Sequence, residues 1–244
     1  MTKKIILIML LFLSLAFYLN RSYSMIYNRN LVPDLTSFWM RPITFTNPNF
    51  QNSVKYVSVG DSLTVGIGTI DGKKTLPYII ASKLSENMSV ILVNVAVKGA
   101  TVKDVAISQL PVAIAEKPNY VTVFIGTNDV HSLISVSSFE AKMDYILNFL
   151  TTQTSAKVIV FNLPYLGSER LILFPYNLFF EYQTKQYNQA LFRVARKYNV
   201  SLIDFYTPTK NQFSRQPNFY SVDSFHPSGE GYIMWGSLLN PKDF

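Results

Sequence analysis

The chain has 244 residues, of which 48% are hydrophobic and 15% charged, so it is long enough and apolar enough to bury a sizeable core. It contains no cysteine and only two histidines, His131 and His226, which excludes disulfide frameworks, thiolate nucleophiles and multi-histidine metal centres. The net charge is +7, but the lysines and arginines are scattered along the chain, which argues against a nucleic-acid partner.

Residues 1–24 have the layout of a secretion signal or a membrane anchor. Lys3 and Lys4 precede the mostly apolar run 5–19, and polar residues follow it. The run is long for the apolar part of a signal peptide but short for a membrane span, which needs about 17 to 25 residues. We therefore expect a signal peptide or an uncleaved anchor, membrane association through residues 5–19, and a secreted or membrane-anchored, extracytoplasmic protein. The alternative is that the run is a buried helix of the globular domain.

The next segment, residues 25–52, is rich in Asn, Ser, Pro and Arg and predicts a linker or a strap on the domain surface with little regular structure. Over residues 53–244, short β-branched runs alternate with longer periodic runs. This alternation predicts parallel strands joined by right-handed helical crossovers, hence one α/β domain of three layers (α/β/α) around a five-stranded parallel sheet. The expected strands are 54–59, 90–95, 120–125, 157–162 and 200–205, and the expected helices are 74–87, 102–117, 138–152, 180–198 and one after Ser228.

Residues suited to acyl transfer follow the first three expected strands and recur near residue 225. Ser62, Gly99 and Asn128 each follow a strand, at the edge of the sheet where α/β proteins bind ligands. We expect Ser62 to be a nucleophile, His226 its base, and Asp223 the group that orients the imidazole. The backbone amides of Ser62 and Gly99 and the side-chain amide of Asn128 are the candidate donors of an oxyanion hole.

Four motifs carry a resemblance to a known family. GDSL at 60–63, VKGA at 97–100, GTND at 126–129 and DSFHP at 223–227 are similar, in order and spacing, to the four conserved blocks of the GDSL, or SGNH, hydrolase superfamily. The resemblance covers about residues 54–239. It implies a flavodoxin-like sheet and serine hydrolysis of esters or thioesters, with the catalytic roles already assigned. We expect no cofactor and no metal.

The other polar residues of these motifs are expected to have structural roles. Asp61 and Asp129 are expected to tie loops together through hydrogen bonds to backbone amides. His131 is expected to be a solvated loop residue, because no partner acid stands at a useful spacing. This leaves His226 as the base.

The segment 163–180, after the fourth expected strand, has a dense apolar and aromatic content. It could line an acyl pocket, rest on a membrane or cover the core. The candidate substrate-binding residues are Leu163, Tyr165, Phe174 and Tyr176.

We expect a serine esterase that hydrolyses carboxylic esters through an acyl-enzyme on Ser62. The apolar segment favours a lipid or other acyl ester over a nucleotide-linked thioester. Aromatic side chains that line a pocket also bind sugars, so the O-acetyl ester of a glycan remains an alternative substrate. The alternatives are a membrane-associated O-acyltransferase and an inactive surface binding module of the same fold.

Overall fold

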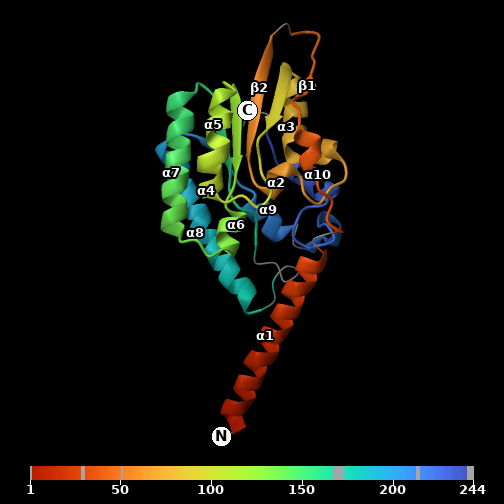
Figure 1. Cartoon of the computed structure of the whole chain (residues 1–244), viewed down its shortest axis with the longest axis vertical. Helices are drawn as coiled ribbons and strands as arrows, with labels where there is room; N and C mark the ends of the chain where they lie inside the picture. Colours follow the sequence, from red (N-terminus) through yellow and green to blue (C-terminus); the bar gives the residue numbers. More distant parts are fainter. Residues whose placement is uncertain are drawn as a thin grey trace.

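A six-stranded sheet forms the centre of the protein (Figure 1). The computed structural model describes residues 2–28, 31–50, 52–166, 172, 174–212 and 215–240. The strands are β1 (Ile43–Phe45), β2 (Ser53–Gly60), β3 (Ser89–Asn94), β4 (Tyr120–Phe124), β5 (Lys157–Phe161) and β6 (Ser201–Ile203). Their spatial order is β1-β3-β2-β4-β5-β6, in which β2 to β6 pair in parallel and β1 pairs antiparallel with β3.

Helices cover both faces of this sheet, which confirms the three-layer α/β fold (Figure 1). One face carries α3 (Leu76–Ser85) and α10 (Gly229–Ser237). The other carries α4 (Val102–Asp104), η4 (Val105–Gln109), α5 (Leu110–Ala115), α7 (Val136–Gln153) and α8 (Tyr176–Lys197). The remaining short helices are η2 (Thr36–Trp39), α2 (Ser62–Val65), η3 (Gly72–Lys74), α6 (Thr127–His131), α9 (Tyr206–Asn211) and η6 (Pro217–Phe219).

Two hydrophobic cores follow from the alternation of side chains along the strands. In β2, Val57 and Val59 are buried among the side chains of α5, α7 and α8. Tyr56 on the same strand is buried on the opposite face, together with Tyr232 and Trp235 of α10. Because both faces are covered, the central strands are apolar nearly throughout, which is the pattern that predicted them.

The sheet has one strand more than expected. β1 lies inside residues 25–52, a segment expected to have little regular structure, and its residues pair with β3 from Ile43 opposite Leu92 to Phe45 opposite Val90. The strap also contacts the domain through Trp39, whose indole nitrogen donates a 2.7 Å hydrogen bond to the Val65 carbonyl. A strand of three residues is too short to show periodicity, so the pairing arises from tertiary contacts.

The N-terminal segment forms one long helix, α1 (Thr2–Asn28), which extends away from the domain (Figure 1). Most of its side chains from Ile5 to Leu19 are exposed, so the apolar run is not a buried helix of the domain. Tyr18 contacts Tyr176 of α8, with ring centroids 4.6 Å apart. In the described part of the chain, no helix combines the length and the apolar character that crossing a membrane requires.

Candidate active site

Ser62 is the first residue of α2, two residues after the end of β2. Asp61 is the N-cap of α2, and its Oδ1 accepts a 2.9 Å hydrogen bond from the Leu63 amide. Gly60 ends the strand where no side chain fits, because a Cβ there would lie 2.2 Å from Oγ1 of Thr64 and 2.3 Å from the Phe124 carbonyl oxygen. The turn therefore places the Ser62 hydroxyl at the start of a helix, with only 7% of the residue exposed.

The structure brings Ser62, His226 and Asp223 into one hydrogen-bonded chain. Nε2 of His226 lies 2.9 Å from Oγ of Ser62, and Nδ1 lies 2.5 Å from Oδ2 of Asp223. The second oxygen of Asp223 accepts hydrogen bonds of 3.0 Å from the backbone amides of Phe225 and His226. All three residues of the chain are buried, so their mutual contacts are shielded from water.

The ionisation of Asp223 fixes the tautomer of His226. Burial by itself raises the pKa of Asp223, but the hydrogen bond and charge of His226, together with two backbone amides, outweigh it and hold the pKa below its ordinary value. An ionised Asp223 accepts the Nδ1 proton, which leaves Nε2 free to accept a proton from Ser62.

The loop that carries Asp223 and His226 is closed by its own backbone. The Ser221 amide donates to the His226 carbonyl at 2.8 Å, and the Ser228 amide donates to the Phe219 carbonyl at 2.8 Å. Ser224 adopts a left-handed conformation with φ of 56°, which turns the chain between Asp223 and His226.

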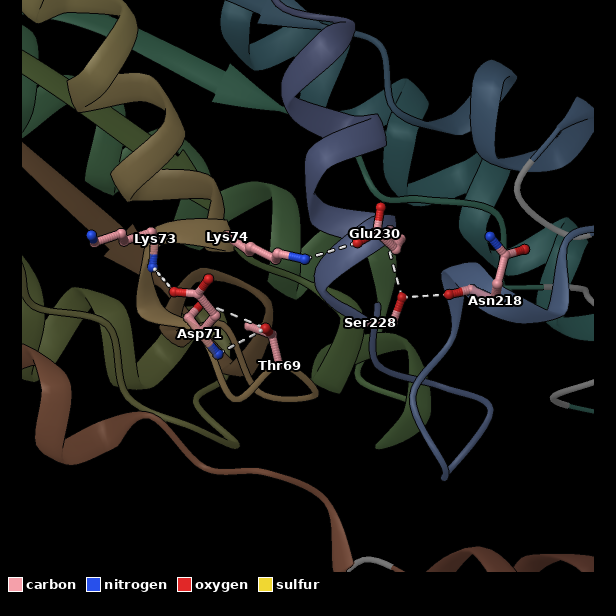
Figure 2. A network of polar contacts seen from close by, with 8 residues as sticks. Thr69, Asp71, Lys73, Lys74, Asn218, Ser228 and Glu230 are labelled. Carbon is pink, nitrogen blue, oxygen red and sulfur yellow. Dashed lines mark hydrogen bonds and ion pairs between the residues drawn. The ribbon is translucent and has the colours of Figure 1, made fainter.

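A second set of polar contacts joins η3 to the start of α10, which directly follows this loop, as Figure 2 shows. Lys74 and Glu230 form an ion pair of 2.8 Å, and Oγ of Ser228 donates to the Asn218 carbonyl at 2.5 Å. The two segments touch at Gly68, with φ of 106°, where a Cβ would lie 2.3 Å from the Pro227 carbonyl oxygen. The loop of His226 is thus held against the same segment that leads away from Ser62.

The candidate oxyanion-hole donors lie at the ends of three neighbouring strands. Ser62 follows β2, Gly99 follows β3 and Asn128 follows β4, and these strands are adjacent in the order β3-β2-β4. Gly99 is exposed and has φ of 78°, with no atom within 4 Å of the position a Cβ would occupy. The Asn128 amide donates a 2.9 Å hydrogen bond to the Ala100 carbonyl, which fixes its side chain beside the Gly99 loop.

The two other acids of the motifs are buried and tie backbone segments together, as predicted. Asp129 accepts hydrogen bonds of 3.0 and 3.2 Å from the Val102 amide, and Asp61 caps α2. Within the described residues, Oδ2 of Asp61 is buried without a hydrogen-bond partner. Burial raises the pKa of Asp61 to about 7, with a further contribution from the charge of Asp129, and burial raises the pKa of Asp129 to about 6.

His131 is not the loop residue that was expected. It is the last residue of α6, although it is exposed as expected, and its ring lies 5.5 Å from that of Phe180 and 5.2 Å from that of Phe225. The loss of water around this ring, and then the charge of His226, lower the pKa of His131. A helix of five residues is too short for a periodic signal, which explains why the sequence predicted a loop.

The four candidate substrate-binding residues lie in different surroundings. Leu163 is fully buried in the core, two residues after the end of β5, where it continues the buried pattern of that strand. Tyr165 is half-buried near Glu181, Tyr176 contacts Tyr18, and Phe174 is 69% exposed. Most of the segment between them, residues 167–171 and 173, lies outside the described residues.

Sequence reasoning missed one side chain of this region, Gln109. It is buried, and its amide makes two hydrogen bonds of 2.9 Å to the backbone of Gly60, accepting from the N–H and donating to the carbonyl. The only signal in the sequence is a polar residue on the buried side of the expected helix 102–117.

Comparisons with known proteins agree with this geometry. The model of the GDSL-like lipase/acylhydrolase family matches residues 58–233. No curated protein sequence matches the chain. Among solved structures, TesA is 18% identical with a TM-score of 0.62 and covers 75% of this chain and 94% of its own. A lipase/acylhydrolase from Enterococcus faecalis is 24% identical with a TM-score of 0.61, covering 76% and 92%.

The acetylxylan esterase Axe2 from Geobacillus stearothermophilus is 20% identical with a TM-score of 0.61, covering 76% of this chain and 91% of its own. At these identities the structural likeness shows the fold, and the family match spans the segment from the end of β2 to α10, which includes all four motifs. This chain is a member of the GDSL-like lipase/acylhydrolase family.

Proposed function

We propose that the protein is a serine hydrolase of carboxylic esters that works through an acyl-enzyme on Ser62. The observation that carries the proposal is the buried chain of hydrogen bonds from Asp223 through His226 to Ser62, in a member of an acylhydrolase family. An inactive binding module does not need these hydrogen bonds. The burial of two titratable side chains would then lower the stability of the fold without serving a function.

The proposed reaction has two halves. Oγ of Ser62 attacks the ester carbonyl carbon while Nε2 of His226 takes its proton, and the imidazolium is stabilised by Asp223. His226 then gives that proton to the departing alkoxide, which leaves the acyl group on Ser62. In the second half, His226 takes a proton from water as the resulting hydroxide attacks the acyl-enzyme; the bond from the acyl carbon to Oγ of Ser62 then breaks, His226 returns the proton to Oγ, and the acid is released.

The proposed oxyanion hole acts in both halves. Each tetrahedral intermediate has a negative oxygen that needs donors already in position. The backbone amides of Ser62 and Gly99 and the side-chain amide of Asn128 are proposed for this role. Their support is the adjacency of β3, β2 and β4, at whose ends they lie.

Two acyl classes remain candidates for the substrate. The likeness to an acetylxylan esterase supports an O-acetyl ester of a glycan. The exposed apolar side chains of α1, of Phe174 just before α8 and of Leu178 in its first turn support a longer acyl ester. An extracytoplasmic location stays a prediction of the N-terminal sequence.

The test is hydrolysis of p-nitrophenyl acetate, butyrate and decanoate by the full chain, with Ser62→Ala as the matched inactive variant and a fluorophosphonate label on Ser62. Turnover that requires Ser62 supports the hydrolase, and its chain-length preference decides between the two acyl classes. Labelling without turnover in water, but with transfer to an added alcohol, would indicate the O-acyltransferase instead. The absence of both labelling and turnover would overturn the proposal.

A further inference from the structure

The side chain of Gln109 binds both backbone groups of Gly60. Its Oε1 accepts a 2.9 Å hydrogen bond from the Gly60 amide, and its Nε2 donates a 2.9 Å hydrogen bond to the Gly60 carbonyl. Gln109 is only 2% exposed, so these bonds form out of contact with water. A buried primary amide that holds one residue at two points fixes the orientation of that residue as well as its position.

Gly60 stands at the junction of two loops that carry proposed oxyanion-hole donors. It precedes Ser62 by two residues, and its carbonyl oxygen also accepts a 3.2 Å hydrogen bond from the Val97 amide. Val97 precedes Gly99 by two residues. The Gly60 carbonyl oxygen therefore accepts hydrogen bonds from both Gln109 and the loop that carries Gly99. Gly60 itself leads directly into the turn that carries Ser62.

The position of Gln109 depends on an irregular helix. The segment expected as one helix over 102–117 is α4, a π-helical turn η4 (Val105–Gln109) and α5, in which Pro111 lies in the first turn. Proline has no N–H to donate within a helix, and π-helical turns are frequent at functional sites. Gln109 ends this wide turn and reaches across to Gly60 on the central strand β2.

We propose that Gln109 is a positioning residue that sets the spacing between the Ser62 and Gly99 backbone amides for binding of the oxyanion. Gln109 acts through Gly60 and does not touch the substrate. The proposal rests on the proposed esterase function. Without the amide, the Gly60 N–H is left buried and unpaired, and the two loops lose the link that holds them in register.

The first variant is Gln109→Met, which keeps the length of the side chain and removes both hydrogen bonds. We expect kcat on p-nitrophenyl acetate to fall about 100-fold with KM nearly unchanged, because small displacements of oxyanion donors act on the transition state. Circular dichroism and thermal unfolding report whether the variant is folded. A folded variant whose kcat stays within about threefold of the wild type would overturn the proposal.

The second variant, Gln109→Glu, is tested by the pH dependence of kcat, which a purely structural role would not change. When ionised, the introduced carboxylate still accepts from the Gly60 amide but repels the Gly60 carbonyl. Burial raises the pKa of such a carboxyl, and once protonated it both donates and accepts as the amide does. We expect the ratio of variant to wild-type kcat to rise at least about 10-fold from about pH 8 to about pH 5. A ratio that does not change with pH would overturn the proposal.

The chain offers a matched control in Asn188. Its amide holds Leu163 in the same two-point manner, with hydrogen bonds of 2.7 Å from the Leu163 amide and 2.9 Å to its carbonyl. Asn188→Leu removes a half-buried amide that holds Leu163 rather than the turn of Ser62, so we expect a lower unfolding temperature and kcat within about threefold of the wild type. An equal fall in kcat for Asn188→Leu and Gln109→Met would show a general loss of stability and overturn the positioning role.

The two proposals fail in distinguishable ways. A wild-type chain that neither labels with fluorophosphonate nor hydrolyses any ester overturns the esterase function and the inference with it. A wild-type chain that hydrolyses esters, beside a Gln109→Met chain that does so equally well, leaves the esterase function in place and overturns only the role of Gln109.

Discussion

Nε2 of His226 lies 2.9 Å from Oγ of Ser62, although 164 residues of sequence separate the two. The contact exists because both residues lie at the same edge of the sheet, Ser62 after the central strand β2 and His226 in a loop closed on itself by backbone hydrogen bonds. Neither side chain needs to move for the serine to lose its proton.

Asp223→Asn tests the tautomer of the base. An asparagine N–H would face Nδ1 of His226 and favour the tautomer whose Nε2 carries a proton, which cannot accept one from Ser62. We expect kcat for p-nitrophenyl acetate to fall about 10⁴-fold while the chain stays folded. Asp204→Asn is the control, because Asp204 accepts from the Tyr206 amide at the end of β6, and it should leave kcat nearly unchanged. Equal activity of the two variants would contradict the triad.

Asn128→Ala tests the side-chain donor of the oxyanion hole. Removing one such donor costs about 3 kcal/mol of transition-state stabilisation, or about 100-fold in kcat, while KM changes little. Steady-state kinetics with p-nitrophenyl acetate measure both parameters. An increase in KM with unchanged kcat would instead assign Asn128 to binding of the ground state.

His131→Phe distinguishes the two histidines. Phenylalanine preserves the ring contacts that His131 makes with Phe180 and Phe225 and removes both ring nitrogens. We expect kcat to stay within about threefold of the wild type, whereas His226→Ala should lower it by about 10⁴-fold. A comparable loss in both variants would mean that the base has been assigned to the wrong histidine or is shared.

Asp61→Asn tests the effect of a buried carboxyl on stability. The pKa of Asp61 is about 7 in the folded chain, against 3.8 for an unperturbed aspartate. The stability that the neutral carboxyl provides is full below about pH 4 and is lost as the pH rises through about 7. Asparagine keeps the hydrogen bond to the Leu63 amide and does not ionise.

We therefore expect the free energy of unfolding in urea to fall from pH 5 to pH 8 in the wild type, and to fall less in Asp61→Asn. Burial raises the pKa of Asp129 in the same direction, so part of the fall remains in the variant. The same fall in both chains would show that Asp61 is already ionised at pH 5.

The parts of the fold that sequence predicted are those governed by local patterns. The five parallel strands are found within about two residues of their expected ends, since buried parallel strands are nearly continuous apolar runs. The approach of His226 to Ser62 was also predicted, because His226 is the histidine with an acid, Asp223, at a useful spacing.

The parts that sequence did not predict depend on tertiary contacts. β1 has three residues and pairs only because the strap crosses the edge of β3. Leu163 looks like an extension of an aromatic surface segment, yet the Asn188 amide holds its backbone in the core. Gln109 is one of several polar residues in the expected helix 102–117, and the sequence does not show that its side chain contacts Gly60.

The order of elements along the chain also has a consequence for biosynthesis. All six strands precede residue 204, whereas the base is residue 226 and its loop is anchored by α10. A chain still being synthesised can thus complete its sheet, with Ser62 in place, while no imidazole is yet beside it. Until the later segment docks against the turn of Ser62, the nascent chain lacks the imidazole that the proposed mechanism uses as its base, so we expect it not to hydrolyse esters.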